Sequence, residues 1–254
     1  MGRLWSYFSK IIIITIPNSD QNRLKKQLKF IGIDNYEIRV FKPAKKTKNN
    51  CGGKNSISLK QLLKHEVCDT TCQNIANNHF TIIQEAFDLN YENILIMEDD
   101  IIFQSITDQQ LFKTISWLSS HDWDIFYFGY CPWPIVFSIP VYSNILKVFT
   151  PLLGHCYALS NKGIKKVMKT KKYYRREHID KFYATHNFRK FALFPCIAFQ
   201  KSAPGLYDIA MDKLGVDIPF DYLTKSFEIL SLLLPILLLL IIIFIIYKFK
   251  FFFL

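Results

Sequence analysis

The first apolar segment of the chain predicts a strand followed by a helix. "KIIIITIP", residues 10–17, is a short β-branched run that ends at a proline, which is typical of a strand buried on both faces of a parallel sheet. Asn18, Ser19 or Asp20 can then cap a helix whose apolar residues recur at positions 24, 28 and 31. Gly32 follows at a position where helices commonly end.

The same alternation of strand and helix continues along the chain. We expect further strands at Tyr36–Phe41, Asn93–Met97, Trp123–Gly129, Gly154–Ser160 and, interrupted by Pro195, Phe191–Gln200. We expect helices at Cys72–Leu89, Gln109–Leu118, Asn161–Lys169 with Asn161 as N-cap, and His178–His186. Strands that alternate with helices of this length indicate βαβ units and a mostly parallel sheet flanked by helices. The predicted class is α/β.

An uncharged apolar segment near the C-terminus predicts a membrane helix. From Ile229 to Tyr247 no charge interrupts about 19 residues, which as a helix would cross roughly 30 Å of hydrocarbon. A buried core helix is the alternative, but such a helix would need apolar partners on every side. We therefore expect one globular catalytic domain over residues 1–226 and a single-pass transmembrane anchor over residues 227–254.

The N-terminus bears on which side of a membrane the domain lies. The apolar run after Lys10 is too short for the core of a signal peptide and lacks a small-residue cleavage site, so we expect the domain to face the cytosol. The few lysines that flank the C-terminal segment leave the orientation open. Gly2 and Ser6 match the M-G-x-x-x-S pattern of myristoylation, which also occurs by chance.

The net charge of the chain indicates which classes of binding partner to expect. The 254 residues contain 32 Lys and Arg against 21 Asp and Glu, a formal net charge of +11 that favours anionic partners. The basic patches do not interleave aromatic residues as a single-strand binding groove would, so we expect no nucleic-acid partner. The richness in Lys, Asn, Ile and Phe hints at a viral or similarly biased genome.

The six cysteines form no disulfide framework by their spacing, and buried thiols are the default expectation. His65, Cys68, Cys72 and His79 are residue types that could close a tetrahedral zinc site. Their spacing matches no common zinc knuckle, so core packing is the preferred interpretation.

Three adjacent acids follow the strand expected at Asn93–Met97. In an open α/β sheet, ligands bind beyond the carboxyl ends of the strands, where Glu98, Asp99 and Asp100 lie. The side chains of residues 98 and 100 of an extended chain point to one side, so Glu98 and Asp100 can bind one Mg²⁺ or Mn²⁺ while Asp99 turns away. Capping of the next turn is the simpler alternative, but three adjacent acids repel one another unless a cation or donors offset the charge.

A family resemblance now becomes visible. "NHFTIIQEAFDLNYENILIMEDD" resembles the signature of glycosyltransferase family 25, the lipopolysaccharide and procollagen galactosyltransferase-like enzymes. The segments "IIIITIPNSDQNR", "WDIFYFG", "GHCYALSNKGIKKV", "HIDKF" and "FPCIAFQ" with "YDI" resemble further parts of the family in matching order. Asn78 and Tyr207 stand where the family usually has serine, which bears on donor and acceptor preference more than on reaction type.

The resemblance implies a GT-A-like nucleotide-diphospho-sugar transferase fold with Mn²⁺ or Mg²⁺ and a UDP-sugar donor. Glu98 and Asp100 would match the metal motif, with Asp99 among them at the sugar nucleotide. The implied reaction moves galactose or glucose, with inversion, to a hydroxyl of a glycan or of a hydroxylysine-containing protein. A membrane-tethered protein of the same fold without activity is the alternative.

The remaining roles follow from what glycosyl transfer needs. Asp180, with Asp208 second, is the candidate base for the acceptor hydroxyl, although Asp180 could equally be a surface acid. Arg23 lies after the first strand, where a nucleotide would bind, but a solvated helix arginine is the simpler interpretation. Gly154 and Tyr157, together with His155, can shape a sugar pocket or simply pack in a strand.

Overall fold

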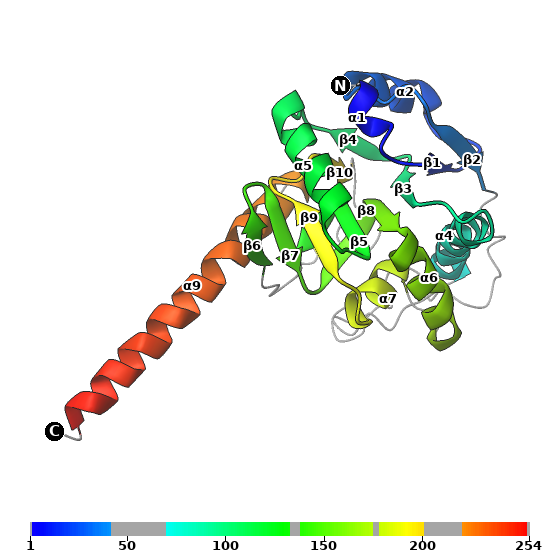
Figure 1. Ribbon diagram of the computed structural model, residues 1–254. Helices are drawn as coiled ribbons and strands as arrows, with labels where there is room; N and C mark the ends of the chain where they lie inside the picture. The colour runs from blue at the N-terminus through cyan, green and yellow to red at the C-terminus, as the bar shows by residue number, and fades with distance from the viewer. Residues whose placement is uncertain (1, 42–69, 133–137, 175–177, 201–219, 253–254) are drawn as a thin grey trace, which may run out of the picture.

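A computed structural model describes residues 2–41, 70–132, 138–174, 178–200 and 220–252 (Figure 1). Eight strands form the main sheet, in the order β2 (Glu37–Val40), β1 (Lys10–Thr15), β3 (Asn93–Glu98), β8 (Pro151–Ser160), β5 (Ile125–Pro132), β9 (Lys190–Leu193), β7 (Ile145–Val148) and β6 (Ser138–Tyr142). A separate antiparallel pair joins β4 (Ile101–Phe103) to β10 (Ala198–Gln200).

Most strands of the main sheet run in one direction. β1 is parallel to β2 and β3, and β9 is parallel to β5. β8 is antiparallel to both β3 and β5, and β7 is antiparallel to both β9 and β6. Six strands therefore point the same way and β8 and β7 are reversed, so the expected α/β class with a mostly parallel sheet flanked by helices is confirmed.

Both faces of the sheet are covered by helices, which explains the uninterrupted apolar runs. Alternate residues of β3 enter different cores: Leu95 and Met97 pack on one face, Ile94 and Ile96 on the other. The first core includes residues of α1 (Gly2–Trp5), α2 (Gln21–Phe30) and α5 (Asp108–Ser120). The second includes residues of α4 (Thr70–Asp88), α6 (Asn161–Thr170) and α7 (Ile179–Thr185).

The structure confirms one predicted helix cap and corrects another. Asp20 caps α2 by accepting a hydrogen bond from the backbone N–H of Arg23 at 3.0 Å, and Gly32 adopts a positive φ of 74° beyond its end. The prediction that Asn161 caps α6 was wrong. Ser160 is the N-cap, because its Oγ accepts from the N–H of Gly163, while Asn161 is the first helical residue.

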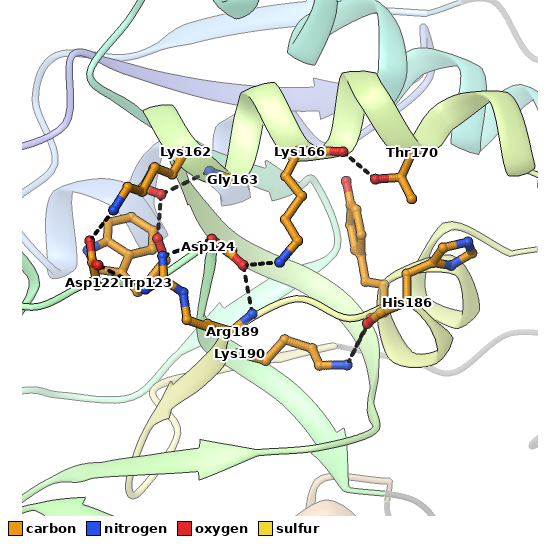
Figure 2. A network of polar contacts seen from close by, with 12 residues as sticks. Asp122, Trp123, Asp124, Lys162, Gly163, Lys166, Thr170, His186, Arg189 and Lys190 are labelled. Carbon is orange, nitrogen blue, oxygen red and sulfur yellow. Dashed lines mark hydrogen bonds and ion pairs between the residues drawn. The ribbon is translucent and has the colours of Figure 1, made fainter.

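A buried aspartate joins α6 to the starts of β5 and β9 (Figure 2). Asp124 accepts hydrogen bonds from the backbone N–H of Arg189 at 2.8 Å and from Lys166 Nζ at 2.9 Å. Burial alone would raise the pKa of Asp124, but these donors bring it below its ordinary value. On the surface beside it, Asp122 pairs with Lys162 and Arg189.

The C-terminal helix α9 (Phe220–Phe252) leaves the domain as a long single helix (Figure 1). Its stretch Ile229–Ile246 has a mean hydropathy of 3.5, is almost entirely exposed, and is long and apolar enough to cross a membrane. Before the helix leaves, Ser231 is buried beside Ser138 of β6, and Leu232 packs against the second core. The predicted apolar C-terminal helix is therefore confirmed.

The 3-10 turn η1 (Lys171–Tyr173) follows α6 and completes the described elements. Five of the described elements were absent from the sequence prediction: α1, β4, β6, β7 and η1. Each of these five is five residues long or shorter, and such short segments carry little periodic signal.

Candidate functional site

The three acids occupy the tight connection between β3 and β4. Glu98 is the last residue of β3, Asp99 and Asp100 form the turn, and Ile101 begins β4. Because β1 is the parallel neighbour of β3, its end lies beside this turn. Thr15 Oγ1 donates a hydrogen bond of 2.6 Å to Asp99 Oδ2, so the Asp99 side chain is directed toward the end of β1.

Arg23 holds the backbone of the acidic turn. Its guanidinium Nη1 donates to the carbonyl oxygen of Ile101 at 2.7 Å, and its Nη2 donates to the carbonyl oxygen of Asp99. Two carbonyls on either side of Asp100 are thus fixed by one side chain of α2. The structure therefore gives Arg23 a place at the predicted site, beside the turn that carries the acids.

Asp100 is the acid whose charge is least well compensated. Its Oδ1 is buried and has no hydrogen-bond partner among the residues that the structure describes. Burial, followed by the negative charges of Glu98 and Asp99, raises the pKa of Asp100 to about 7. The nearby Arg23 only partly opposes this effect. Such an arrangement favours an added positive charge beside the carboxylate.

The donor set at this turn fits a hard divalent cation. Glu98 and Asp100 offer carboxylate oxygens, the ligands that Mg²⁺ and Mn²⁺ prefer, and the unpartnered Oδ1 of Asp100 has a lone pair to give. No group of three or more His, Cys, Asp or Glu side chains placed to hold a metal occurs within the described ranges. A cation here would therefore need oxygens from phosphate or water to complete its coordination.

Glu98 also touches a buried polar chain that leads into the core. Its Oε2 accepts a hydrogen bond of 3.4 Å from Gln200 Nε2, and its Oε1 lies 3.5 Å from Nε2 of the fully buried His79. His79 Nδ1 is hydrogen-bonded to the Tyr157 hydroxyl at 2.8 Å, which in turn is hydrogen-bonded to the Tyr183 hydroxyl at 3.1 Å. The polar chain Glu98–His79–Tyr157–Tyr183 thus joins β3, α4, β8 and α7.

Sequence reasoning left the role of His79 open. The residue was considered as a packed histidine, as a member of the zinc alternative, or as a bridge from a helix to the sheet, and the structure shows the bridge, from α4 to Tyr157 of β8. A signal was nevertheless present, since His79 shares the helical face of Ala76, Phe80 and Ile83, all of which are buried. A histidine on the core-facing side of a helix needs polar partners inside the protein. The strand β3, which reaches His79, ends in the acid Glu98.

Gly154, Tyr157 and Asp180 lie around the same group of tyrosines. A Cβ atom on Gly154 would lie 3.6 Å from ring atoms of both Tyr127 and Tyr157. Asp180 is in the first turn of α7, where its Oδ1 accepts from the N–H of Lys181 at 2.8 Å. Burial, followed by the electrostatic influence of Tyr183 and Asp180, raises the pKa of Tyr127. The structure brings these three predicted residues to one side of the sheet.

A glycine allows the two sheets to approach each other beside Glu98. His155 Nε2 is hydrogen-bonded to the carbonyl oxygen of Ala198 in β10 at 2.8 Å. A Cβ atom on Gly129 of β5 would lie 2.3 Å from that oxygen and 2.4 Å from His155 Nε2, so no larger residue fits. The close packing of β10 brings Gln200 to the Glu98 carboxylate.

Several predicted residues are outside the described part of the chain. Asp208, the second candidate base, lies there, as do His65 and Cys68 of the zinc alternative. Cys156 and Cys196, which are described, are buried and form no disulfide with another described residue.

Comparisons with known proteins were made for the whole chain. No family model matches the sequence, and no curated protein matches it. Among solved structures, the protein A197 from STIV has a TM-score of 0.42 at 11% identity, over 76% of this chain and 86% of that one. The UTP-bound UGPase from Acinetobacter baumannii has a TM-score of 0.39 at 12% identity, over 87% and 98%. A glycosyltransferase involved in glycosylation of the major capsid of PBCV-1 has a TM-score of 0.39 at 11% identity, over 80% and 98%.

Proposed function

We propose that this chain is a metal-dependent glycosyltransferase that moves galactose or glucose from a UDP-sugar to a hydroxyl acceptor on a glycan or a hydroxylysine-containing protein. The observation that carries the proposal is the acidic turn after β3, in which Asp100 Oδ1 is buried without a hydrogen-bond partner among the described residues. The sequence resemblance to glycosyltransferase family 25 covers the same turn and supports this interpretation of it.

Glu98 and Asp100 are the proposed metal ligands. A bound Mn²⁺ or Mg²⁺ would offset the negative charge of the diphosphate leaving group. Asp99 is held away toward Thr15, which leaves its neighbours to share the cation. Gln200 is proposed to orient the Glu98 carboxylate, because its Nε2 donates a hydrogen bond to Oε2. His79 Nε2 lies 3.5 Å from the other oxygen, and no hydrogen bond to a described residue is formed by this nitrogen.

The nucleotide is proposed to bind near the end of β1. Ligands of open α/β sheets bind beyond the carboxyl ends of the strands, and Arg23 supplies a positive charge at this place. The net charge of +11 favours the approach of an anionic donor. Gly154 and Tyr157 are proposed to line the site on the side of β8, where the glycine leaves room beside the tyrosine rings.

Asp180 is the proposed base, with Asp208 as the second candidate. A carboxylate beside the acceptor hydroxyl takes its proton while the new glycosidic bond forms with inversion at the anomeric carbon. The N–H of Lys181 donates to Asp180 Oδ1, which holds the carboxylate in the first turn of α7. The same helix carries Tyr183, whose ring packs against that of Tyr157.

The test is release of UDP by the full chain in detergent from a panel of UDP-sugars, with Mn²⁺ or with EDTA. We expect release from one donor only when Mn²⁺ is present, and loss of release in Asp100→Ala. Asp88→Ala is the matched control, because Asp88 is an exposed acid at the end of α4. Binding of Mn²⁺ alone, followed by calorimetry, should weaken in Asp100→Ala and not in Asp88→Ala.

Two results would contradict the proposal. If folded protein binds Mn²⁺ but releases no UDP with any donor or acceptor, the chain is better described as a tethered binding protein of this fold. If it neither binds Mn²⁺ nor releases UDP, the assignment of Glu98 and Asp100 as ligands fails as well.

A further inference from the structure

The edge strand β6 exposes apolar side chains on both of its faces. Ile139, Val141 and Tyr142 in β6, and Phe149 just after β7, are each 41 to 49% exposed. Edge strands of soluble domains usually carry charged side chains, since an apolar edge promotes association. Several exposed apolar side chains on one short hairpin therefore indicate a surface that is covered when the protein works.

The same hairpin lies against the helix that can cross a membrane. Ser138, the first residue of β6, is buried, and its Oγ is 3.3 Å from Oγ of the buried Ser231 in α9. Figure 1 shows β6 beside α9 where the helix leaves the domain. The start of β6 is thus adjacent to the first turns of the apolar stretch of α9.

The contact also sets the depth of the hairpin. Ser231 lies inside the apolar stretch Ile229–Ile246, two residues from its first residue. At 1.5 Å per residue, Ser231 is about 3 Å along the axis from the start of that stretch. With α9 across a bilayer, β6 would begin at the level where the helix enters the hydrocarbon.

The residue types suit the boundary between lipid and water better than they suit a second protein. Tyr142 and Phe149 are aromatic, and aromatic side chains are enriched at membrane interfaces. Lys147 Nζ lies 5.7 Å from the centre of the Phe149 ring and can meet anionic headgroups. Pro140 removes a backbone donor from β6, which disfavours pairing of this edge with another strand.

We propose that the β6–β7 hairpin lies on the membrane surface, with Ile139, Val141, Tyr142 and Phe149 in the interfacial layer next to α9. The proposal requires α9 to span the bilayer and is independent of the transferase activity. Its function would be to hold the domain against the lipid at a second point.

The test uses the full chain reconstituted into vesicles of phosphatidylcholine and phosphatidylserine. An environment-sensitive fluorescent amino acid replaces Tyr142, Phe244 or Tyr173 in three separate samples. Phe244 reports on the span itself, and Tyr173, an exposed tyrosine at the end of η1, is the matched control. Brominated lipids then quench any probe that touches the bilayer.

We expect blue-shifted emission and quenching by brominated lipid at positions 142 and 244, and neither at position 173. Quenching at 244 without quenching at 142 would overturn the proposal, because the helix would then be inserted while the hairpin stays in water. A blue shift at 142 that depends on the ratio of protein to lipid, without quenching, would overturn it by assigning the hairpin to a contact between copies. Absence of quenching at both 142 and 244 would also overturn it.

Discussion

Two buried tyrosine hydroxyls in the same cluster differ in their hydrogen bonding. The Tyr157 hydroxyl is bonded to His79 and Tyr183, whereas that of Tyr127 has no partner within the described ranges. We expect Tyr157→Phe to lower the free energy of unfolding by about 1–3 kcal/mol, because it leaves two buried polar groups with fewer partners. Tyr127→Phe should leave the free energy of unfolding unchanged or raise it.

Urea denaturation of the two variants and of the unmodified chain measures these free energies of unfolding. The two substitutions remove the same atom from rings buried to the same degree, so the difference between them isolates the hydrogen bonds. Equal effects of Tyr157→Phe and Tyr127→Phe would show that the Glu98–His79–Tyr157–Tyr183 chain adds nothing to stability.

Repulsion among three neighbouring carboxylates should lower the melting temperature of the protein even when no substrate is present. Burial, and then the charges of Glu98 and Asp99, raise the pKa of Asp100, so its ionised form is disfavoured in the folded protein. In EDTA at pH 8, we expect Asp100→Asn to raise the melting temperature, because the amide carries no charge and keeps the shape. Mn²⁺ should raise the melting temperature of the unmodified chain and not that of Asp100→Asn. A melting temperature lowered by Asp100→Asn in EDTA would contradict this account.

At the scale of elements, Asp124 binds one helix and two strands together. Its pKa is lowered in the folded state, so its contribution to stability is complete above the unfolded pKa of about 3.9 and is lost as pH falls through the lower folded value. We expect Asp124→Asn to cost about 2–3 kcal/mol at pH 7, the value of hydrogen bonds to a charged group. The difference from the unmodified chain should shrink below about pH 4.

Asp122→Asn is the control for this pH dependence. Asp122 also pairs with Lys162 and Arg189, but its side chain is 63% exposed. Exposed ion pairs contribute little, so Asp122→Asn should change the free energy of unfolding far less than Asp124→Asn does. A constant difference between Asp124→Asn and the unmodified chain from pH 7 to pH 3 would exclude the charge of Asp124 as the cause.

Elements with a strong periodic or apolar pattern could be predicted from the sequence. α4 was expected at Cys72–Leu89 and is found at Thr70–Asp88, because one face of the helix is consistently apolar. The direction of β8 could not be predicted, because a strand buried on both faces has the same pattern in either direction. β6 escaped notice because its exposed residues break the alternation of a half-buried strand.

The site was predictable to the extent that it depends on one segment of chain. Three acids at the end of an apolar strand mark Glu98 and Asp100 by position alone. The contribution of Gln200 and His79 depends on how β10 and α4 approach β3, and no local pattern records such contacts between distant segments. For the same reason, the anchoring of Asp99 by Thr15 and of the turn by Arg23 emerged only from the fold.

At the scale of the whole molecule, the exposed part of α9 should govern solubility. From Ile236 to Ile246 the helix exposes a continuous series of large apolar side chains, whereas Ser231 and Leu232 contact the domain. We expect the full chain to require detergent and a chain ending at Pro235 to remain soluble without it. A chain ending at Pro219, just before α9 begins, should be less stable than the one ending at Pro235, because it loses the contact of Ser231 and Leu232.

Centrifugation and thermal melting of the two shortened chains check this prediction. A chain ending at Pro235 that still sediments without detergent would show that another surface, such as the β6–β7 hairpin, is sufficient for association. Equal melting temperatures of the two shortened chains would show that the first part of α9 does not stabilise the domain.

If α9 spans a membrane and the chain has the proposed activity, the contact between α9 and the domain affects how the domain meets its acceptor. A domain on a flexible linker sweeps a volume above the membrane, but one whose helix contacts β6 through Ser231 and Ser138 has less freedom to move. The acidic turn would then keep to a narrower range of heights and directions above the lipid. Such an enzyme would select acceptors by the distance of their hydroxyls from the bilayer as well as by their chemistry.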